Sequence, residues 1–186
     1  MYCNKSLKKY LDDLAAKLPA PGGGSAAALT AALGASLISM VVNFTLGKSK
    51  YAQYQEELKD TLESSERLTK ELLNSVDLDV IAYQSKDAKR ALNVPRNVCR
   101  LCFEAIQLCP GLVKKGNINL ISDVAVAAVL LESAFRSAYF NVEINLKILK
   151  DEKLTGNLTK ELSAKARQIE RIRSETEVKV GEIIRG

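Results

Sequence analysis

The chain has 186 residues, with 27 Lys and Arg against 22 Asp and Glu, a net charge of +5, and 47% of its residues are hydrophobic. This length and composition fit a single folded domain over residues 1–186 and exclude a disordered or collagen-like chain. With 4 Pro, 10 Gly and 5% aromatic residues, an all-β sandwich is disfavoured and helices are favoured. The sequence contains no histidine, so any proton transfer must use Asp, Glu, Lys, Tyr, Cys or water.

Apolar residues recur at helical spacing along most of the chain, and no segment alternates as a strand does over more than a few residues. Pro and Gly separate several of these segments. The pattern predicts an all-α bundle of about six helices, over residues 6–17, 26–46, 51–83, 95–109, 119–150 and 157–185. Pro110 and Gly111 interrupt the end of the fourth of these helices.

The second predicted helix lies in a segment without charge, because no Asp, Glu, Lys or Arg occurs between Leu18 and Gly47. Residues 26–46 are long enough to cross a bilayer, but they are mainly alanine and include hydroxyl and amide side chains. We therefore expect a central, fully buried helix and no membrane partner. A helix buried on all sides in so small a chain predicts a homodimer.

The charge distribution bears on the class of partner. A positive balance is compatible with nucleic acid or with a small anionic molecule. From Lys147 to the end, however, basic and acidic residues are interleaved, as on a solvated helix face. No nucleic-acid partner is expected.

The four cysteines are Cys3, Cys99, Cys102 and Cys109. A Cys-x-x-Cys pair can belong to a redox or zinc site, but here no βαβ pattern, second pair or histidine accompanies it. Cys99, Cys102 and Cys109 share one helix face, so we expect them to be buried free thiols, and we expect no metal site. Several free thiols, together with the lack of a secretory leader in residues 1–5, predict a cytoplasmic protein.

A Pro-Gly-Gly-Gly-Ser sequence at residues 21–25 precedes the uncharged helix. A helix start presents unpaired backbone N–H groups, and glycines leave them accessible to an anion or to the polar edge of a heterocycle. The alternative is structural, with Ser25 as a cap and the glycines allowing close packing.

Carboxylates and amides within apolar helices are further candidates. Asp123 is the one charge in a long apolar stretch, where burial would raise the pKa of an unpaired carboxylate, unless it merely caps the helix. Asn43, Asn141 and Asn145 could bind a buried polar group. A separate pair, at positions 77 and 79, lies about 200° apart on a helix, so at most one of these aspartates faces the core.

Several motifs occur in a particular order: Leu18-Pro-Ala-Pro-Gly-Gly-Gly-Ser-Ala-Ala-Ala28, then Gly34 with Met40-Val41, Asp77-x-Asp79-x-x-Ala-Tyr83, Gly116-Asn-x-Asn-x-x-Ser-Asp123 and Phe140-Asn-Val-x-Ile-Asn-Leu146. In this combination, from about residue 6 to residue 185, the sequence resembles the C-terminal family of formiminotransferase-cyclodeaminases. The resemblance implies a dimeric all-α bundle with a folate site near the glycine-rich helix start.

The resemblance also implies a folate one-carbon enzyme with one of two reactions. Such an enzyme hydrolyses 5,10-methenyltetrahydrofolate to 10-formyltetrahydrofolate, or cyclises 5-formiminotetrahydrofolate with release of ammonia. The tetrahydrofolate derivative is then the substrate, and no permanently bound cofactor is expected. The alternatives are a non-catalytic helical adaptor and a small membrane protein.

Both reactions pass through a tetrahedral carbon between two nitrogens and need a group that takes and returns a proton. We assign that role to Asp123, with Asp79 as second choice, and expect Lys48 to attract the anionic folate tail. The expected substrate-binding residues are Pro21, Gly22, Gly23, Gly24, Ser25, Asn43, Tyr51, Asn117, Ser122, Asn141 and Asn145.

One departure from the family pattern concerns the connection after Tyr83. The family usually carries roughly twenty more residues before the position of Val94, more than most helix connections need. Here residues 84–93 make the whole connection. This predicts either a true deletion or a loop missing from the sequence.

Overall fold

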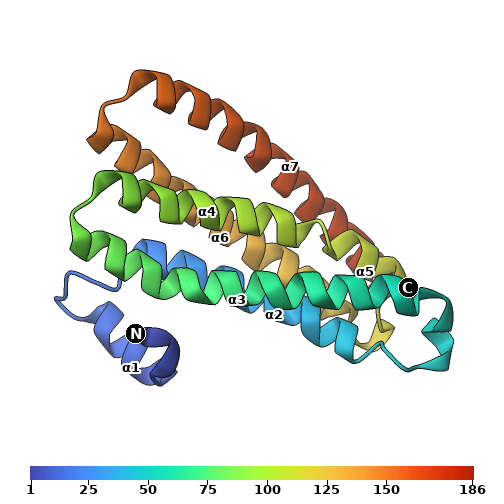
Figure 1. Ribbon diagram of the computed structural model, residues 1–186. Coiled ribbons are helices and arrows are strands. Elements are labelled where there is room, and N and C mark those ends of the chain that lie inside the picture. The colour runs from blue at the N-terminus through green and yellow to red at the C-terminus, as the bar shows by residue number, and fades with distance from the viewer.

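The computed structural model describes residues 1–186 and contains helices and turns but no strand (Figure 1). Short 3₁₀ turns at Tyr2–Asn4, Ser49–Tyr54 and Ile118–Leu120 precede α1, α3 and α6. The α-helices are α1 (Leu7–Ala15), α2 (Gly23–Asn43), α3 (Gln55–Ser85), α4 (Ala88–Ile106), α5 (Cys109–Lys115), α6 (Ile121–Leu149) and α7 (Glu152–Arg185). The predicted all-α class is confirmed.

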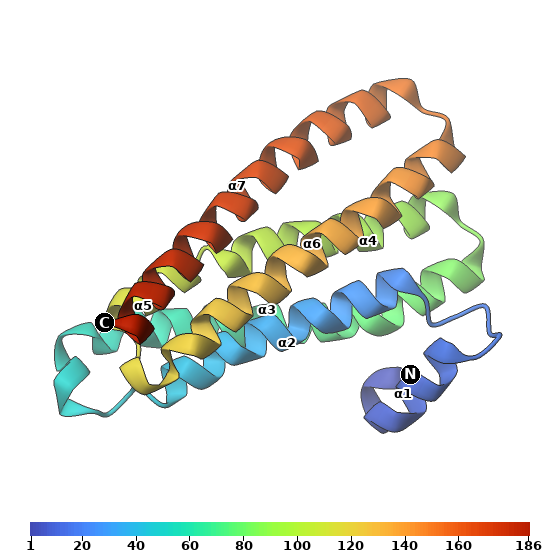
Figure 2. The ribbon, with the colours of Figure 1, turned by 180° about the vertical axis from the view of Figure 1, so that it is seen from behind.

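Helices α2, α3, α4 and α6 pack side by side, while α1 lies at one end and α7 crosses the bundle obliquely (Figures 1 and 2). Helix α2 approaches α6 closely at Gly34. A Cβ there would lie 2.9 Å from Leu131 Cγ and 3.2 Å from the Ala127 carbonyl oxygen of α6. Small residues thus let the backbones of α2 and α6 approach each other.

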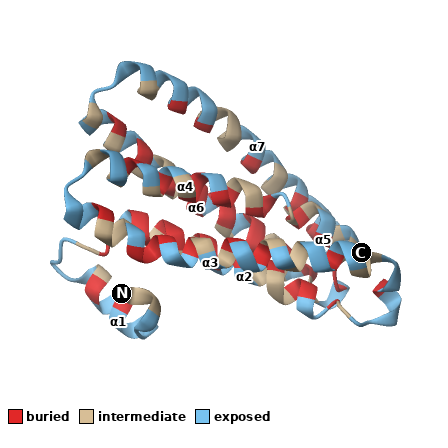
Figure 3. Ribbon diagram, in the orientation of Figure 1, coloured by how far each residue is buried: buried red, intermediate tan, exposed pale blue.

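Burial of α2 within one chain is incomplete. Its inner side is buried, as Figure 3 shows for the core helices, but Leu33 is 54% exposed and Phe44, just after the helix, is 58% exposed. Large apolar side chains are also exposed on α6, which lies beside α2 (Figure 2). We call these exposed side chains of α2 and α6 the outer apolar face; its residues are Leu33, Phe44, Val126, Val129, Phe140, Ile144 and Ile148.

Two segments, Gly23–Asn43 and Ile118–Leu149, are long and apolar enough to span a membrane by length and composition alone. About half of each segment's most apolar window is buried inside the bundle, at 56% and 44%. The core helix of a soluble bundle passes the same test, so the hydropathy of these two segments has a structural explanation in their packing.

The connection from α3 to α4 is a tight turn. Lys86 adopts a left-handed conformation with φ of 56°, and the Asp87 carboxylate accepts hydrogen bonds from the Lys89 and Arg90 amides. Helix α4 therefore begins at residue 88 and not at residue 95 as predicted. The turn between α6 and α7 repeats this design with Lys150 and Asp151.

Pro95 lies inside α4, where the missing N–H leaves the Ala91 carbonyl without its helical partner. The Asn145 side chain of α6 supplies a substitute, since its Nδ2 donates to the Ala91 oxygen at 3.0 Å. The sequence pattern placed the helix start at this proline because proline is favoured in a first turn. A tertiary hydrogen bond allows the helix to continue through it.

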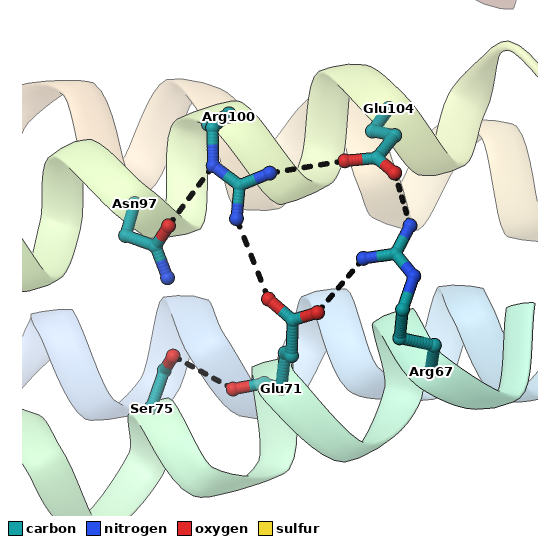
Figure 4. Close-up of polar contacts among 6 residues, drawn as sticks. All are labelled: Arg67, Glu71, Ser75, Asn97, Arg100 and Glu104. Atoms are coloured by element: carbon teal, nitrogen blue, oxygen red, sulfur yellow. Dashed lines mark hydrogen bonds and ion pairs between the residues drawn. The ribbon is translucent and has the colours of Figure 1, made fainter. Parts of the chain in front are cut away.

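Ion pairs tie the surfaces of neighbouring helices together. Between α3 and α4, Arg67 and Arg100 alternate with Glu71 and Glu104 in a closed network (Figure 4). These groups are 37–50% exposed, so each pair contributes little stability. The carboxylate of Glu132, between α6 and α7, is buried and accepts from Arg136 and Arg173.

The thiols of Cys99, Cys102 and Cys109 are free and fully buried, which confirms their predicted role as small core residues. Burial raises the pKa of the Cys99 and Cys109 thiols to about 12. These thiols remain protonated and unreactive at neutral pH.

Candidate active site

A pocket of about 330 Å³ opens where the start of α2 meets the ends of α3 and α6 and the first turn of α4. This volume falls in the range of small-molecule sites. The lining combines free backbone groups, one carboxylate, two amides and an apolar wall. Its residues are Pro19, Ala20, Gly22, Gly23, Gly24, Asp79, Ala82, Tyr83, Ala91, Asn141, Ile144, Asn145 and Ile148.

The glycine turn forms one side of this pocket. Gly22 is the N-cap of α2 and offers no side chain to the first amides of the helix. A Cβ on Gly24 would lie 2.1 Å from Asp79 Oδ1, a collision that only glycine avoids. The helix start therefore presents its backbone to the pocket directly beside a carboxylate.

Asp79 provides the only carboxylate in the pocket lining. Burial raises the pKa of this group, and the neighbouring Ser25 amide opposes the rise. Asp77, two residues earlier, faces another way: it is 3% exposed and accepts from the Tyr2 and Cys3 amides. The expectation that the two aspartates diverge is confirmed, and Asp79 is the one that lines the pocket.

The two amides come from successive turns of α6. Asn145 Nδ2 donates to Ala91 O at 3.0 Å and to Asn141 O at 2.7 Å, while Asn141 Nδ2 donates to Ser137 O at 2.9 Å. Both side-chain oxygens, and one N–H of Asn141, remain free for a ligand. Such donors and acceptors suit the polar edge of a heterocycle.

Sequence comparison places the chain among known proteins. Residues 6–88 and 84–164 match the sequence profile described as formiminotransferase-cyclodeaminase. The chain belongs to this family. The two matched segments of the profile meet at residues 84–88, which form the tight turn between α3 and α4. This break agrees with a connection that is shorter here than in the family profile.

Relatives of two kinds share this family. Methenyltetrahydrofolate cyclohydrolase of Methylorubrum extorquens is 37% identical over 182 residues, which covers 86% of this chain and 88% of that protein. Formimidoyltransferase-cyclodeaminase of Rattus norvegicus is 31% identical over 79% of this chain, and the matched part is 31% of that longer protein. The crystal structure of formiminotetrahydrofolate cyclodeaminase from Thermotoga maritima superposes with a TM-score of 0.91 at 30% identity, over 97% of this chain and 98% of that one.

Several predicted site residues of this family member lie at the opposite end of the bundle. Asp123 stands in the first turn of α6, 18 residues before Asn141, or about 27 Å along the helix. It is half-buried, which corrects the expectation that its apolar neighbours in sequence enclose it, because several of them point outward. The others at this end are Asn43, Lys48, Tyr51, Asn117 and Ser122.

Two of those far-end residues serve the fold. Asn117 is buried, its amide N–H donates to Thr45 Oγ1 at 2.9 Å, and its Nδ2 donates to the Phe44 carbonyl at 3.1 Å. The buried Tyr51 hydroxyl accepts from the Ile118 amide at 3.1 Å. Asn43, Lys48 and Ser122 are exposed and line no part of the pocket.

Two residues of the glycine turn also face inward. Ser25 is fully buried, and its hydroxyl donates to the Val76 carbonyl at 3.0 Å. Pro21 is buried behind the turn. Tyr83, by contrast, lines the pocket and was not among the predicted ligands. Its position four residues after Asp79, on the same helix face, was the signal that could have identified it.

Proposed function

We propose that this protein hydrolyses 5,10-methenyltetrahydrofolate to 10-formyltetrahydrofolate in the pocket at the glycine turn. The observation that carries the proposal is the 37% identity to a methenyltetrahydrofolate cyclohydrolase, which extends over 88% of that enzyme. The pocket supports it, since a carboxylate, free helix amides and two asparagines surround a space large enough for a folate ring system.

Asp79 acts as the proton carrier in this proposal. Its carboxylate takes a proton from water as the water oxygen bonds to the methenyl carbon, which gives a tetrahedral carbon between N5 and N10. Asp79 then gives a proton to N5 as the carbon–N5 bond breaks. The hydroxyl proton leaves to solvent as the formyl group forms on N10. A carboxyl whose pKa is raised by burial suits both steps.

The remaining pocket groups bind and orient the substrate. The free amide atoms of Asn141 and Asn145 and the first backbone N–H groups of α2 meet the polar edge of the pterin. Tyr83, Ile144 and Ile148 provide apolar contact area. Lys48 lies at the other end of the bundle, so the predicted attraction of the folate tail to this lysine has no support within one chain.

Cyclisation of 5-formiminotetrahydrofolate is the second candidate reaction, favoured by the likeness to the Thermotoga maritima cyclodeaminase over nearly the whole of both chains. Here N10 attacks the formimino carbon and loses its proton, and the amino group leaves as ammonia after receiving a proton. The same carboxylate can move the proton in both reactions.

We further propose a homodimer joined through the outer apolar face. Exposed large apolar side chains of α2 and α6 gather on this face, and such apolar patches mark interaction sites. Ile144 and Ile148 also line the pocket, so the pocket adjoins the proposed interface. A cytoplasmic location agrees with the four free thiols. Neither nucleic acid nor a membrane is part of the proposal.

The test uses both folates with the same preparation. Loss of the ultraviolet band of 5,10-methenyltetrahydrofolate, faster than its spontaneous hydrolysis, reports cyclohydrolase activity. Appearance of that band from 5-formiminotetrahydrofolate, with release of ammonia, reports cyclodeaminase activity. We expect a higher kcat/KM for the cyclohydrolase reaction than for the cyclodeaminase reaction. Absence of both rate enhancements would refute the proposed function.

A further inference from the structure

A chain of hydrogen bonds connects α1 with the first turn of α2 and with α3, on the side of the glycine turn away from the pocket. Tyr10 of α1 is 4% exposed, and its hydroxyl donates to Ser25 Oγ at 3.2 Å. Ser25 Oγ donates onward to the Val76 carbonyl at 3.0 Å. Val76 precedes Asp79 by three residues, less than one turn of the same helix.

The N-terminal segment holds the Tyr10 ring in this position. The ring of Tyr2 packs edge-on against it, with centroids 5.3 Å apart at 86°. The Tyr2 hydroxyl donates to Asp13 at 3.0 Å, and the Tyr2 and Cys3 amides donate to the buried Asp77 carboxylate. Residues 2–13 are therefore fastened to α3 close to Asp79.

This attachment matters because Gly24 and Asp79 are in direct contact. Their relative position depends on how the first turn of α2 packs on α3. The next residue, Ser25, joins these two elements there through its hydroxyl, which donates to Val76, and through its amide, which lies beside Asp79. The Tyr10 hydroxyl donates a hydrogen bond to the oxygen of that Ser25 hydroxyl. No residue of α1 lines the pocket, and the hydrogen bond that the Tyr10 hydroxyl makes toward the glycine turn is the one to Ser25.

We infer that Tyr10 is a positioning residue, which acts through Ser25 to hold the glycine turn against Asp79. The inference rests on the proposed function, in which Asp79 carries the proton. Without the Tyr10 hydroxyl, Ser25 Oγ keeps its bond to the Val76 carbonyl but loses its second partner. The first turn of α2 is then held less tightly, and water reaches the Asp79 carboxylate.

The surroundings of Asp79 make this effect measurable by titration. The titratable groups that face it are Tyr10 from α1 and Tyr83 from α3; the pocket residues from α2, α4 and α6 carry no charge. Burial is the main cause of the raised pKa of Asp79. Added hydration should therefore lower that pKa toward the ordinary value for aspartate.

The experiment compares Tyr10→Phe with Tyr139→Phe in the full chain. Tyr139 shares a hydrogen bond with Ser163 Oγ between α6 and α7, so its variant loses a tyrosine hydroxyl that contacts no pocket residue. For Tyr10→Phe we expect kcat for 5,10-methenyltetrahydrofolate to fall about tenfold or more, as small misplacements of reacting groups do. We expect KM to change less, and the acid limb of kcat/KM to move to lower pH. Tyr139→Phe should leave all three unchanged.

Two further measurements separate positioning from simple destabilisation. Ser25→Ala removes the bonds to both Tyr10 and Val76, so it should lose at least as much kcat as Tyr10→Phe. The double variant should lose little more than Ser25→Ala alone, because that change already leaves the Tyr10 hydroxyl without its partner. A double variant in which the two losses multiply would overturn the inference. So would a folded Tyr10→Phe protein with the kcat and acid limb of the parent.

An NMR titration of ¹³C-labelled aspartates gives a readout that does not need turnover. The Asp79 signal is assigned by its absence in Asp79→Asn. A lower Asp79 pKa in Tyr10→Phe than in the parent supports the inference even if neither folate is a substrate; an unchanged pKa overturns it. Failure of the proposed function is thus distinguishable from failure of the positioning role.

Discussion

The carboxylate of Asp79 occupies the space that a side chain at position 24 would need. An ideal Cβ on Gly24 would lie 2.1 Å from Asp79 Oδ1 and 2.7 Å from its Cγ. At Gly23 the nearest atom is Asn141 Nδ2, at an ordinary contact distance of 3.8 Å. Of the two adjacent glycines, therefore, only Gly24 is prevented from carrying a side chain by the proposed proton carrier.

Gly24→Ala should displace the Asp79 carboxylate and reduce kcat. We expect a fall of about 100-fold, the size seen when reacting groups move by about 1 Å. Gly23→Ala adds the same methyl group in ordinary contact with Asn141 and should lose far less. Steady-state kinetics with 5,10-methenyltetrahydrofolate compares the two, and equal losses would show that the Gly24–Asp79 contact has no special role.

Asp79→Asn should increase stability in a manner that depends on pH. Because burial raises the pKa of Asp79 in the folded state, the folded protein binds a proton more tightly than the unfolded chain does. Stability is then lost as the pH rises through the folded-state pKa. The gain in unfolding free energy from Asp79→Asn should grow from near pH 3.8 toward neutral pH. Urea denaturation at several pH values measures this gain; a gain independent of pH would contradict the assignment.

Glu132→Gln tests the attachment of α7 to α6. The buried carboxylate accepts from Arg136 Nε and Arg173 Nε, each at 2.7 Å, and a neutral amide would leave both guanidinium groups less well paired. We expect a loss of about 1–3 kcal/mol in unfolding free energy. The control is Glu170→Gln, which removes an exposed partner of Arg136 and should cost less than about 1 kcal/mol. Equal effects in urea denaturation would argue against a special role for Glu132.

Leu33→Glu tests the proposed homodimer. Leu33 lies on the outer apolar face and is 54% exposed, and Val178 on α7 is exposed to the same extent. A charge buried in the interface should convert the dimer to monomer, while Val178→Glu should leave it intact. Sedimentation velocity at micromolar concentration distinguishes the two species. A dimer that survives Leu33→Glu would place the interface elsewhere.

The fold class could be predicted because the periodicity of apolar residues is a local property. The boundaries that failed depend on tertiary contacts. Helix α4 passes through Pro95 because Asn145, fifty residues later, satisfies the Ala91 carbonyl. The turns at Lys86 and Lys150 place lysine in a left-handed conformation, where glycine is the expected residue. No sequence pattern predicts the continuation of α4 through Pro95 or the left-handed lysines.

The candidate site was predicted only in part, because its local features can be found in the sequence and its tertiary contacts cannot. The glycine turn, Asn141 and Asn145 could be found from residue type and position, and they meet in one pocket. Asp123 was favoured over Asp79 because its neighbours in sequence are apolar, but sequence neighbours on a helix point in all directions. Which of two aspartates faces a pocket depends on how α3 packs against α2, and this is decided by contacts between distant residues such as Ser25 and Val76.

Comparison of Asp79→Asn with Asp123→Asn tests the central claim most directly. Both changes keep the side-chain shape and remove the ability to carry a proton, and they act at opposite ends of the bundle. General acid–base catalysis typically contributes about 10²- to 10⁴-fold. We predict that Asp79→Asn lowers kcat for 5,10-methenyltetrahydrofolate at least 100-fold with folate binding retained, whereas Asp123→Asn stays within a few-fold of the parent. The reverse result, with turnover lost in Asp123→Asn and kept in Asp79→Asn, would contradict the account.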